Sequence, residues 1–410
     1  MTLRQEADAI IHAALRAAQP DAAVRRALRA LPDCRGRLLL VAAGKAAWQM
    51  AAAAQAALGG RIADGVVITK YGHARGALDG LRIFEGGHPV PDANCFAATD
   101  AAMALARGAG PEDMVLFLLS GGGSALFEKP LLPPQELASL TSALLACGAD
   151  IVEINTVRKR LSAVKGGRFA QLCAPARVFS VILSDVLGDP PDMIASGPAY
   201  PDSSTSEQAQ AIAEKYALPL SGQARALLRE ETPKRLENVQ THIAGSVRQL
   251  CKAACEQCRA LGYRPLVLTD SLRCQAREAG SFLASVAAYH QDSAESLAVI
   301  AGGETVVRVT GTGLGGRNQE LALAAAPGIA GFRDTALFSV GSDGTDGPTD
   351  AAGGYVDGRT ASALRACGLR VDDVLADNDA YHALEAVGGL IVTGATGTNV
   401  NDLTVLLIRR

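Results

Sequence analysis

The stretch DMVLFLLSGGGSA (residues 113–125) joins an uninterrupted apolar run to a cluster of glycines, and this combination decides the fold class. Residues 114–119 are all apolar instead of alternating with polar residues, which is typical of a parallel strand that is covered on both faces. Glycines follow the run directly. At the end of such a strand, glycine lets the backbone approach a ligand closely, as in α/β enzymes.

Segments on both sides repeat this pattern. RLLLVAAGK (37–45) and RVFSVILSD (177–185) are also mainly apolar runs, and Ala-rich stretches of helical length lie between the runs. This alternation predicts a parallel or mixed β-sheet with helices on both faces. A charged, proline-containing run at 229–237 predicts a domain boundary. Beyond it we expect a second α/β series, with strands at 297–301 and 305–310 and a helix from Arg317.

Composition limits the classes of partner. The 410 residues carry 42 acidic and 39 basic side chains, a net charge of −3, and 49% are hydrophobic. The balance excludes a basic stripe for nucleic acid, and no run reaches the roughly 20 uninterrupted apolar residues of a membrane span. Charged residues near the N-terminus argue against a signal peptide. We expect a cytoplasmic protein that binds small molecules, and neither nucleic acid nor a membrane.

The nine cysteines lack the spacing of a disulfide framework, which favours a reducing compartment. Cys251, Cys255 and Cys258 have the spacing of one helix face. We expect them to be small buried residues rather than zinc ligands.

Two strand ends carry groups that suit a phosphate. The loop Ser120–Ala125 offers backbone N–H groups at an expected helix start, which together form an anion site. This loop matches neither the P-loop pattern nor GxGxxG. Lys45 follows Gly44 at the end of the first long strand, where a doubly wound sheet presents its ligand. A tight turn and an ordinary surface lysine are the alternatives.

Acidic loops follow two other strands. Asp185 and Asp189 come after the strand at 177–183, and Asp343 and Asp346 come after the strand at 335–340. Carboxylates combined with substrate phosphates are the ligands that Mg²⁺ prefers, although Asx turns explain these residues about equally well. His88, in GGHPVP (86–91), is the histidine whose setting suits contact with a ligand.

Arg317 begins a helix after the glycine-rich segment 311–316. An arginine is poorly placed at the positive end of a helix dipole, so a functional role explains it naturally. A solvated surface arginine is the alternative.

Several segments together resemble the class II glycerate kinases: NTVRKRLSAVKGGRFA (155–170), SDVLGDPPDMIASGP (184–198), GTGLGGRNQELALA (311–324), DGTDGPTDAAG (343–353) and TGATGTNVNDL (393–403). With GKAA (44–47), the resemblance runs from about residue 43 to residue 407. It implies a Rossmann-like α/β/α domain over residues 1–232, an α/β MOFRL domain over 238–410, and an active site in the cleft between them. This sequence departs from the family at Ala395, where proline is usual, and at Cys274-Gln275-Ala276, where Gly-Glu-Ala is expected.

The resemblance also implies ATP-dependent phosphorylation of the 2-hydroxyl of D-glycerate with Mg²⁺ or Mn²⁺. On matching positions it assigns the catalytic lysine to Lys45 and the catalytic arginine to Arg317. We hypothesise that Asp185 orients or deprotonates the 2-hydroxyl. The other expected site residues are substrate or phosphate binders (Ser120, Gly121, Gly122, Gly123, Ser124, Glu304 and Asn318) and metal ligands (Asp189, Asp343 and Asp346).

Two other functions stay open. Gly311, Gly313 and Gly316 fit the GxGxxG spacing of an NAD(P)H-dependent hydroxypyruvate reductase. Its ribose-binding acid would be Asp334, which precedes the next strand instead of ending it. A non-catalytic sugar-phosphate-binding protein would keep the anion loops and need no metal carboxylates. The oligomeric state is left open, with a homodimer among the options.

Overall fold

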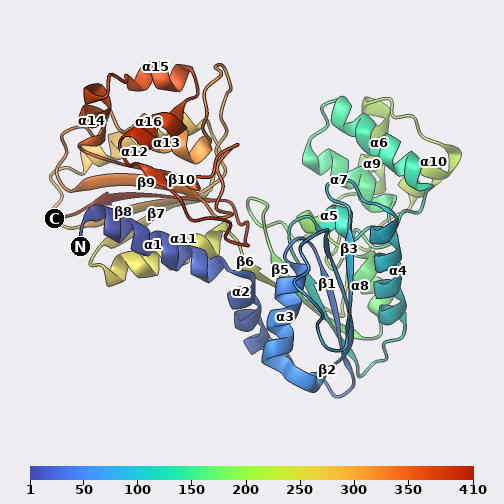
Figure 1. Ribbon diagram of the computed structural model, residues 1–410. Helices are drawn as coiled ribbons and strands as arrows, with labels where there is room; N and C mark the ends of the chain where they lie inside the picture. The colour runs from blue at the N-terminus through green and yellow to red at the C-terminus, as the bar shows by residue number, and fades with distance from the viewer. The chain divides into compact units, whose positions relative to one another are not determined.

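The computed structural model describes all 410 residues, and the chain divides into two α/β units (Figure 1). Unit 2 is the continuous segment Pro20–Ala244, and unit 1 combines Met1–Gln19 with Gly245–Arg410. This division differs from the predicted domains at the N-terminus, because helix α1 (Leu3–Ala18) belongs to unit 1. The physical reason is that Glu6 of α1 accepts a hydrogen bond from Tyr263 and pairs with Arg409.

Unit 2 is built on a six-stranded sheet in the order β3-β2-β1-β4-β5-β6. The first five strands are parallel. Val41 and Phe117 face a core shared with α4 and α8, whereas their neighbours Leu40 and Leu116 face a core shared with α2 and α3. Both faces are therefore buried, which explains the uninterrupted apolar runs. The strands are β1 (Leu38–Ala43), β2 (Ile62–Lys70), β3 (Leu81–Gly86), β4 (Met114–Leu119), β5 (Arg177–Leu183) and β6 (Val239–Gly245).

The helices of unit 2 fall into two groups (Figure 1). One group covers the two sheet faces: α2 (Pro20–Ala27), α3 (Ala47–Leu58), α4 (Ala93–Arg107) and α8 (Arg168–Cys173). The other group packs around an apolar core of its own: α6 (Pro134–Ala146), α7 (Ile151–Arg160), α9 (Ser206–Lys215) and α10 (Gly222–Arg229). A single turn, α5 (Gly123–Leu126), follows β4.

Unit 1 has a mixed six-stranded sheet in the order β11-β10-β9-β12-β8-β7. Strand β12 is antiparallel to both β8 and β9, so the first residue of β12 lies at the same edge as the carboxyl ends of β8 and β9. The strands are β7 (Arg264–Leu272), β8 (Leu297–Gly303), β9 (Thr335–Gly341), β10 (Gly353–Asp357), β11 (Leu390–Ile391) and β12 (Asp402–Ile408).

Helices cover both faces of this sheet (Figure 1). Helices α1 and α11 (Val247–Ala260) lie on one face, and Cys251, Cys255 and Cys258 are buried there, as predicted. The other face carries α12 (Ala276–Tyr289), α13 (Arg317–Ala325), α14 (Thr360–Ala366), α15 (Val371–Ala376) and α16 (Ala380–Ala386). None of the helices combines the length and apolar character needed to span a bilayer.

One predicted strand is wrong. Residues 305–310 are irregular and make a single bridge, between Val306 and Gln275. The strand that precedes this segment, β8, is already paired with β7 on one side and β12 on the other, so neither edge of β8 is free for another strand.

Candidate active site

In unit 2, the backbone at Gly44, directly after β1, packs closely against Ser120, directly after the adjacent strand β4. Gly44 has a φ of 125°, and a Cβ there would lie 2.2 Å from the Ser120 Oγ. The next residues are tied to the same loop, because Lys45 N donates to the Gly121 carbonyl at 2.9 Å and Ala46 N donates to Ser120 Oγ at 3.0 Å. These contacts leave the Lys45 side chain exposed at the carboxyl edge of the sheet, where it was predicted.

The glycine loop, which we define as Ser120–Ser124, keeps part of its backbone free. The N–H groups of Gly121 and Gly122 have no acceptor within the protein. Gly123 and Ser124 instead pack against the protein. A Cβ on Gly123 would lie 2.8 Å from the Ala195 Cβ. The Ser124 Oγ lies 3.2 Å from the Ser196 hydroxyl. The available anion donors are therefore two backbone N–H groups beside Lys45. The helix that follows is a single turn, too short for the expected helix-dipole contribution.

Asp185, after β5, lies against the glycine loop. A Cβ on Gly121 would lie 2.3 Å from the Asp185 Oδ2, so only glycine allows the carboxylate to approach the loop this closely. The structure thus brings together Lys45, Asp185 and the free N–H groups of the loop, three of the features that the sequence predicted for this edge.

Asp189 occupies a strained position in the same loop as Asp185. Its φ is 51°, and its Oδ1 is buried without a hydrogen-bond partner. The loop is anchored from α7, where the fully buried Lys159 lies 3.4 Å from the Asp192 carboxylate and 2.8 Å from that of Asp202. An unpaired buried carboxylate oxygen on an anchored loop is the kind of group that a cation would satisfy.

In unit 1, Arg317 and Asp402 form a two-pronged ion pair at the edge where β8, β9 and β12 meet. Arg317 Nε lies 2.6 Å from Asp402 Oδ2, and Nη2 lies 3.0 Å from Oδ1. The remaining nitrogen, Nη1, is 3.3 Å from Glu304 Oε1. Burial acts to lower the pKa of Arg317, but the contacts with Asp402 outweigh it and raise the pKa above its usual range. Arg317 is therefore a fixed cation.

Burial lowers the pKa of an arginine but raises that of a carboxyl group such as Asp402. It raises the pKa of this carboxyl above its ordinary value, while the Arg317 guanidinium opposes the rise. Sequence reasoning missed Asp402 as a site residue. The available signal was an acidic residue placed directly before an apolar strand, LTVLLI (403–408), where a charge is unusual.

Asp346 and Asn318 have interior roles, and the geometry revises what the sequence predicted for both. The Asp346 carboxylate accepts four hydrogen bonds, from the backbone and side-chain N–H groups of Asn318 and of Gln319, and so fixes the start of α13. Asn318 is 1% exposed, and its amide oxygen accepts a bond from Ser339. The hydrogen bonds of both side chains are made to other parts of unit 1. Both instead hold the helix that carries Arg317.

The predicted metal ligands belong to different units, Asp189 to unit 2 and Asp343 and Asp346 to unit 1. No group of three or more His, Cys, Asp or Glu side chains is arranged to hold a metal ion. Asp343 is half-buried, and its Oδ1 accepts a bond from Thr345 N at 3.0 Å. Of the three predicted ligands, Asp189 has the buried unpaired oxygen, Asp343 is partly engaged and Asp346 is fully engaged.

The glycine-rich segment 311–316 packs against protein. A Cβ on Gly311 would lie 2.3 Å from the Asp377 backbone, and Gly313 N donates to the Asp377 carbonyl at 2.8 Å. No strand precedes the segment. Asp334, the acid proposed for a dinucleotide ribose, is paired with Arg409 at 2.6 Å. The GxGxxG spacing thus lacks the strand-turn-helix setting that a dinucleotide site needs.

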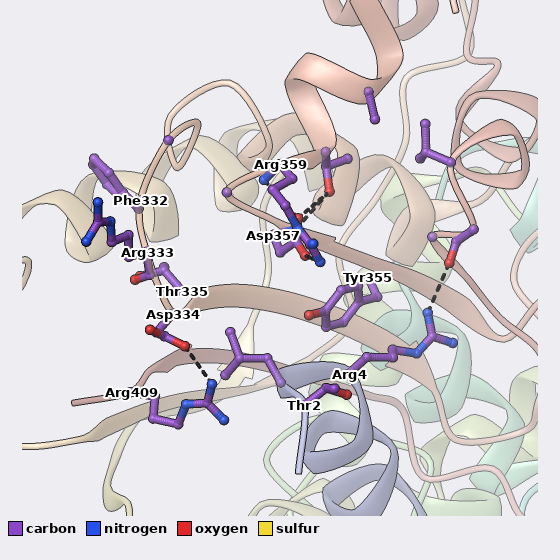
Figure 2. A pocket seen from close by; sticks show the side chains of 18 of the residues that line it. Thr2, Arg4, Phe332, Arg333, Asp334, Thr335, Tyr355, Asp357, Arg359 and Arg409 are labelled. Carbon is purple, nitrogen blue, oxygen red and sulfur yellow. Dashed lines mark hydrogen bonds and ion pairs between the residues drawn. The ribbon is translucent and has the colours of Figure 1, made fainter. Parts of the chain in front are cut away.

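A cavity of about 950 Å³ lies at the opposite end of the unit 1 sheet (Figure 2). Three of its arginines are tied to the protein. Arg409 pairs with Asp334, Arg359 lies 3.3 Å from the Asp357 carboxylate, and Arg4 donates to two backbone carbonyls. Strand β12 runs from Arg317's partner, Asp402, to this cavity over seven residues, roughly 20 Å. The cavity is therefore separate from the Arg317–Asp402 pair.

Comparisons with known proteins cover nearly the whole chain. Residues 6–229 match the family described as a domain of unknown function (DUF4147), and residues 297–402 match the MOFRL family. A D-glycerate 2-kinase of Thermotoga maritima is 51% identical over 99% of both chains. The crystal structure of a glycerate kinase from that organism superposes with a TM-score of 0.95, covering 99% of each chain at 51% identity.

More distant relatives also match along nearly the whole length of this chain. A glycerate 2-kinase of Pyrococcus horikoshii is 37% identical over 100% of this chain and 98% of its own. The crystal structure of a P. horikoshii protein superposes with a TM-score of 0.94, at 37% identity over 100% of this chain and 99% of its own. A protein of Agrobacterium vitis, 39% identical over 100% of this chain and 95% of its own, is named provisionally as a hydroxypyruvate reductase.

Proposed function

The chain belongs to the family of glycerate 2-kinases built from the DUF4147 and MOFRL domains, and we propose that it transfers the γ-phosphoryl group of ATP to the 2-hydroxyl of D-glycerate, giving 2-phosphoglycerate and ADP. The observation that supports this most directly is the exposed Lys45 beside two free backbone N–H groups. Phosphoryl transfer depends on positioning and charge neutralisation more than on covalent chemistry, and these groups supply both.

In unit 2, we assign phosphate binding to the glycine loop and charge neutralisation to Lys45. The free N–H groups of Gly121 and Gly122 would donate to phosphate or carboxylate oxygens, and the flexible Lys45 ammonium would approach the transferring group as a point charge. Asp185, held against Gly121, would orient the glycerate.

In unit 1, we assign charge neutralisation at a phosphoryl group to Arg317. Because Asp402 holds Nε and Nη2, the nitrogen with the most freedom is Nη1. Glu304 touches that nitrogen and would give way to a phosphoryl oxygen, or would bind the hydroxyl groups of glycerate. The activities of Lys45 and Arg317 variants test these assignments.

We propose Mg²⁺ as the accompanying metal, held by Asp189 together with the phosphates of ATP. The unpaired Oδ1 of Asp189 fits this role, and Mg²⁺ is commonly held by one or two carboxylates plus phosphates rather than by a protein cage. Asp343 is the second candidate ligand. When bound, the metal would supply charge neutralisation at the phosphates.

Two assays on the purified protein test the proposal. In the first, enolase and pyruvate kinase are coupled to the reaction with phosphoglycerate mutase left out, so that only 2-phosphoglycerate gives a signal. In the second, oxidation of NADH or NADPH is followed with hydroxypyruvate as substrate. We expect a signal in the first assay alone. ADP formation without the enolase signal would indicate the 3-isomer, and reduction of hydroxypyruvate would restore the reductase alternative.

A further inference from the structure

The segment after β3 brings a histidine to the glycine loop. A Cβ on Gly122 would lie 3.2 Å from His88 Nε2, 3.1 Å from His88 Cδ2 and 3.0 Å from Lys45 Cγ. A single glycine therefore separates the imidazole from the stem of Lys45. The chain reaches this point from two sides, because Lys45 follows β1 and His88 follows β3. Any substrate that contacts Lys45 and the Gly122 N–H is within reach of the His88 ring.

The surroundings of His88 favour the neutral form of its imidazole. Burial lowers the pKa of His88, and the nearby charges of Lys45, Lys70 and His73 lower it further. A neutral imidazole carries a lone pair on one ring nitrogen and can accept a proton.

Carboxylates close to His88 in sequence, and the one beside the glycine loop, have other contacts. Asp92 accepts hydrogen bonds from the Tyr71 hydroxyl and Cys95 N, and Glu85 accepts one from Ala74 N. The carboxylate of Asp185 contacts the neighbouring residue of the glycine loop, Gly121.

We propose that His88 is the general base of the kinase reaction, an inference that rests on the proposed function. His88 Nε2 takes the proton of the glycerate 2-hydroxyl while the oxygen forms its bond to the γ-phosphorus of ATP. The bond from the γ-phosphorus to the bridging oxygen breaks, and its electron pair leaves with ADP. The imidazolium then releases the proton to solvent. The sum is D-glycerate and ATP giving 2-phosphoglycerate, ADP and one proton.

The alternative base is Asp185, and the two differ in the pH range in which their side chains ordinarily titrate. A free aspartate titrates near pH 4 and a free imidazole near 6.5. The dependence of kcat on pH therefore separates them. Asp346, whose pKa burial raises to about 6, titrates in the same range as an imidazole, so the assignment needs variants as well as the wild-type profile.

The experiment measures kcat and KM for D-glycerate between pH 4.5 and 8, at saturating ATP and Mg²⁺, by formation of 2-phosphoglycerate. We expect the wild-type kcat to fall on the acid side with an apparent pKa below 6.5. His88→Asn should lower kcat at pH 7 by about 10²–10⁴-fold and remove this acid limb. Imidazole added to His88→Ala should restore part of the rate. His73→Asn is the matched control, since it removes another imidazole close to Lys45, and should keep the limb.

Three results would overturn the inference: an acid limb retained in His88→Asn, a His88→Asn variant in which only KM changes, or loss of the limb in Asp185→Asn alone. Each leaves the kinase function standing as long as the wild type makes 2-phosphoglycerate. A wild type that makes none refutes the proposed function itself, so the two failures are distinguishable.

Discussion

Arg317 binds Asp402 through two nitrogens at once, at 2.6 and 3.0 Å, and this pair joins the first residue of α13 to the first residue of β12. The guanidinium is thereby fixed in direction, with Nη1 left toward Glu304. Of the basic side chains, only arginine can hold a carboxylate through two nitrogens and keep a third for another partner.

Arg317→Lys should therefore fail almost as badly as Arg317→Ala. A lysine ammonium can pair with Asp402 or reach a phosphoryl group, but its single nitrogen cannot do both in the arginine geometry. The measurement is kcat/KM for ATP and for D-glycerate in both variants. Arg277→Lys is the control, because Arg277 also pairs with a carboxylate in unit 1, that of Glu320. A lysine variant within about threefold of wild type, roughly 0.7 kcal/mol, would reduce Arg317 to a general electrostatic role.

Lys45→Ala should lower kcat by about 10²–10³-fold and leave the fold intact, since the Lys45 side chain is exposed and only its backbone holds the glycine loop. Circular dichroism and the melting temperature check the fold, and Lys129→Ala provides the comparison with a surface lysine of the same unit. An unchanged kcat would remove Lys45 from the catalytic machinery.

Activity should disappear after chelation with EDTA and return with Mg²⁺ or Mn²⁺. Asp189→Asn should raise the Mg²⁺ concentration needed for half-maximal activity by about tenfold or more, because it removes the charge of the carboxylate with the unpaired oxygen. Asp343→Asn should shift it less. Equal Mg²⁺ titrations for wild type and Asp189→Asn would show that Asp189 has a structural role only.

Asp346→Asn should change how stability depends on pH. Burial raises the pKa of Asp346 from 3.8 to about 6, so the folded state holds this proton more tightly than the unfolded state. The stabilisation from that proton is present below pH 4 and is lost as pH rises to about 6, by an amount on the order of 2–3 kcal/mol. Urea unfolding at pH 4 and pH 7 measures it. The loss should appear in wild type and be absent in Asp346→Asn, and parallel curves would contradict the assignment.

Periodicity was enough to predict most of the fold. Continuous apolar runs such as 38–43 and 114–119 predict strands buried on both faces, and both are strands. The false strand at 305–310, TVVRVT, is rich in β-branched residues, which favour strands. The pairing of β8 with β7 and β12 leaves no edge of β8 free for it, and local sequence does not contain that information. The placement of α1 in unit 1 also depends on partners more than 200 residues away, such as Tyr263.

Sequence alone could predict those site residues that directly follow a strand, because parallel strands bring such residues to one edge of the sheet. Lys45 and Asp185 follow strands of the same parallel sheet, so their common edge follows from topology. Asp346 and Asn318 have the same sequence signal, polar residues in glycine-rich loops. Unlike Lys45 and Asp185, these two residues hydrogen-bond to each other. Only the three-dimensional contacts reveal that N–H groups of the protein already occupy the Asp346 carboxylate. Asp402 was missed because its partner, Arg317, lies 85 positions away.

The two-part makeup of unit 1 has a consequence for synthesis on the ribosome. Helix α1 is translated first, but α11, the helix that covers the same sheet face, follows only after residues 20–244 have been made. At about 5–20 residues per second, this interval lasts roughly 10–45 s. During it the apolar side of α1, with Ile10 and Ile11, has no sheet to cover. Unit 2, an unbroken segment, can fold within that time, so the nascent chain carries a folded unit 2 while α1, which precedes it, is still unpacked.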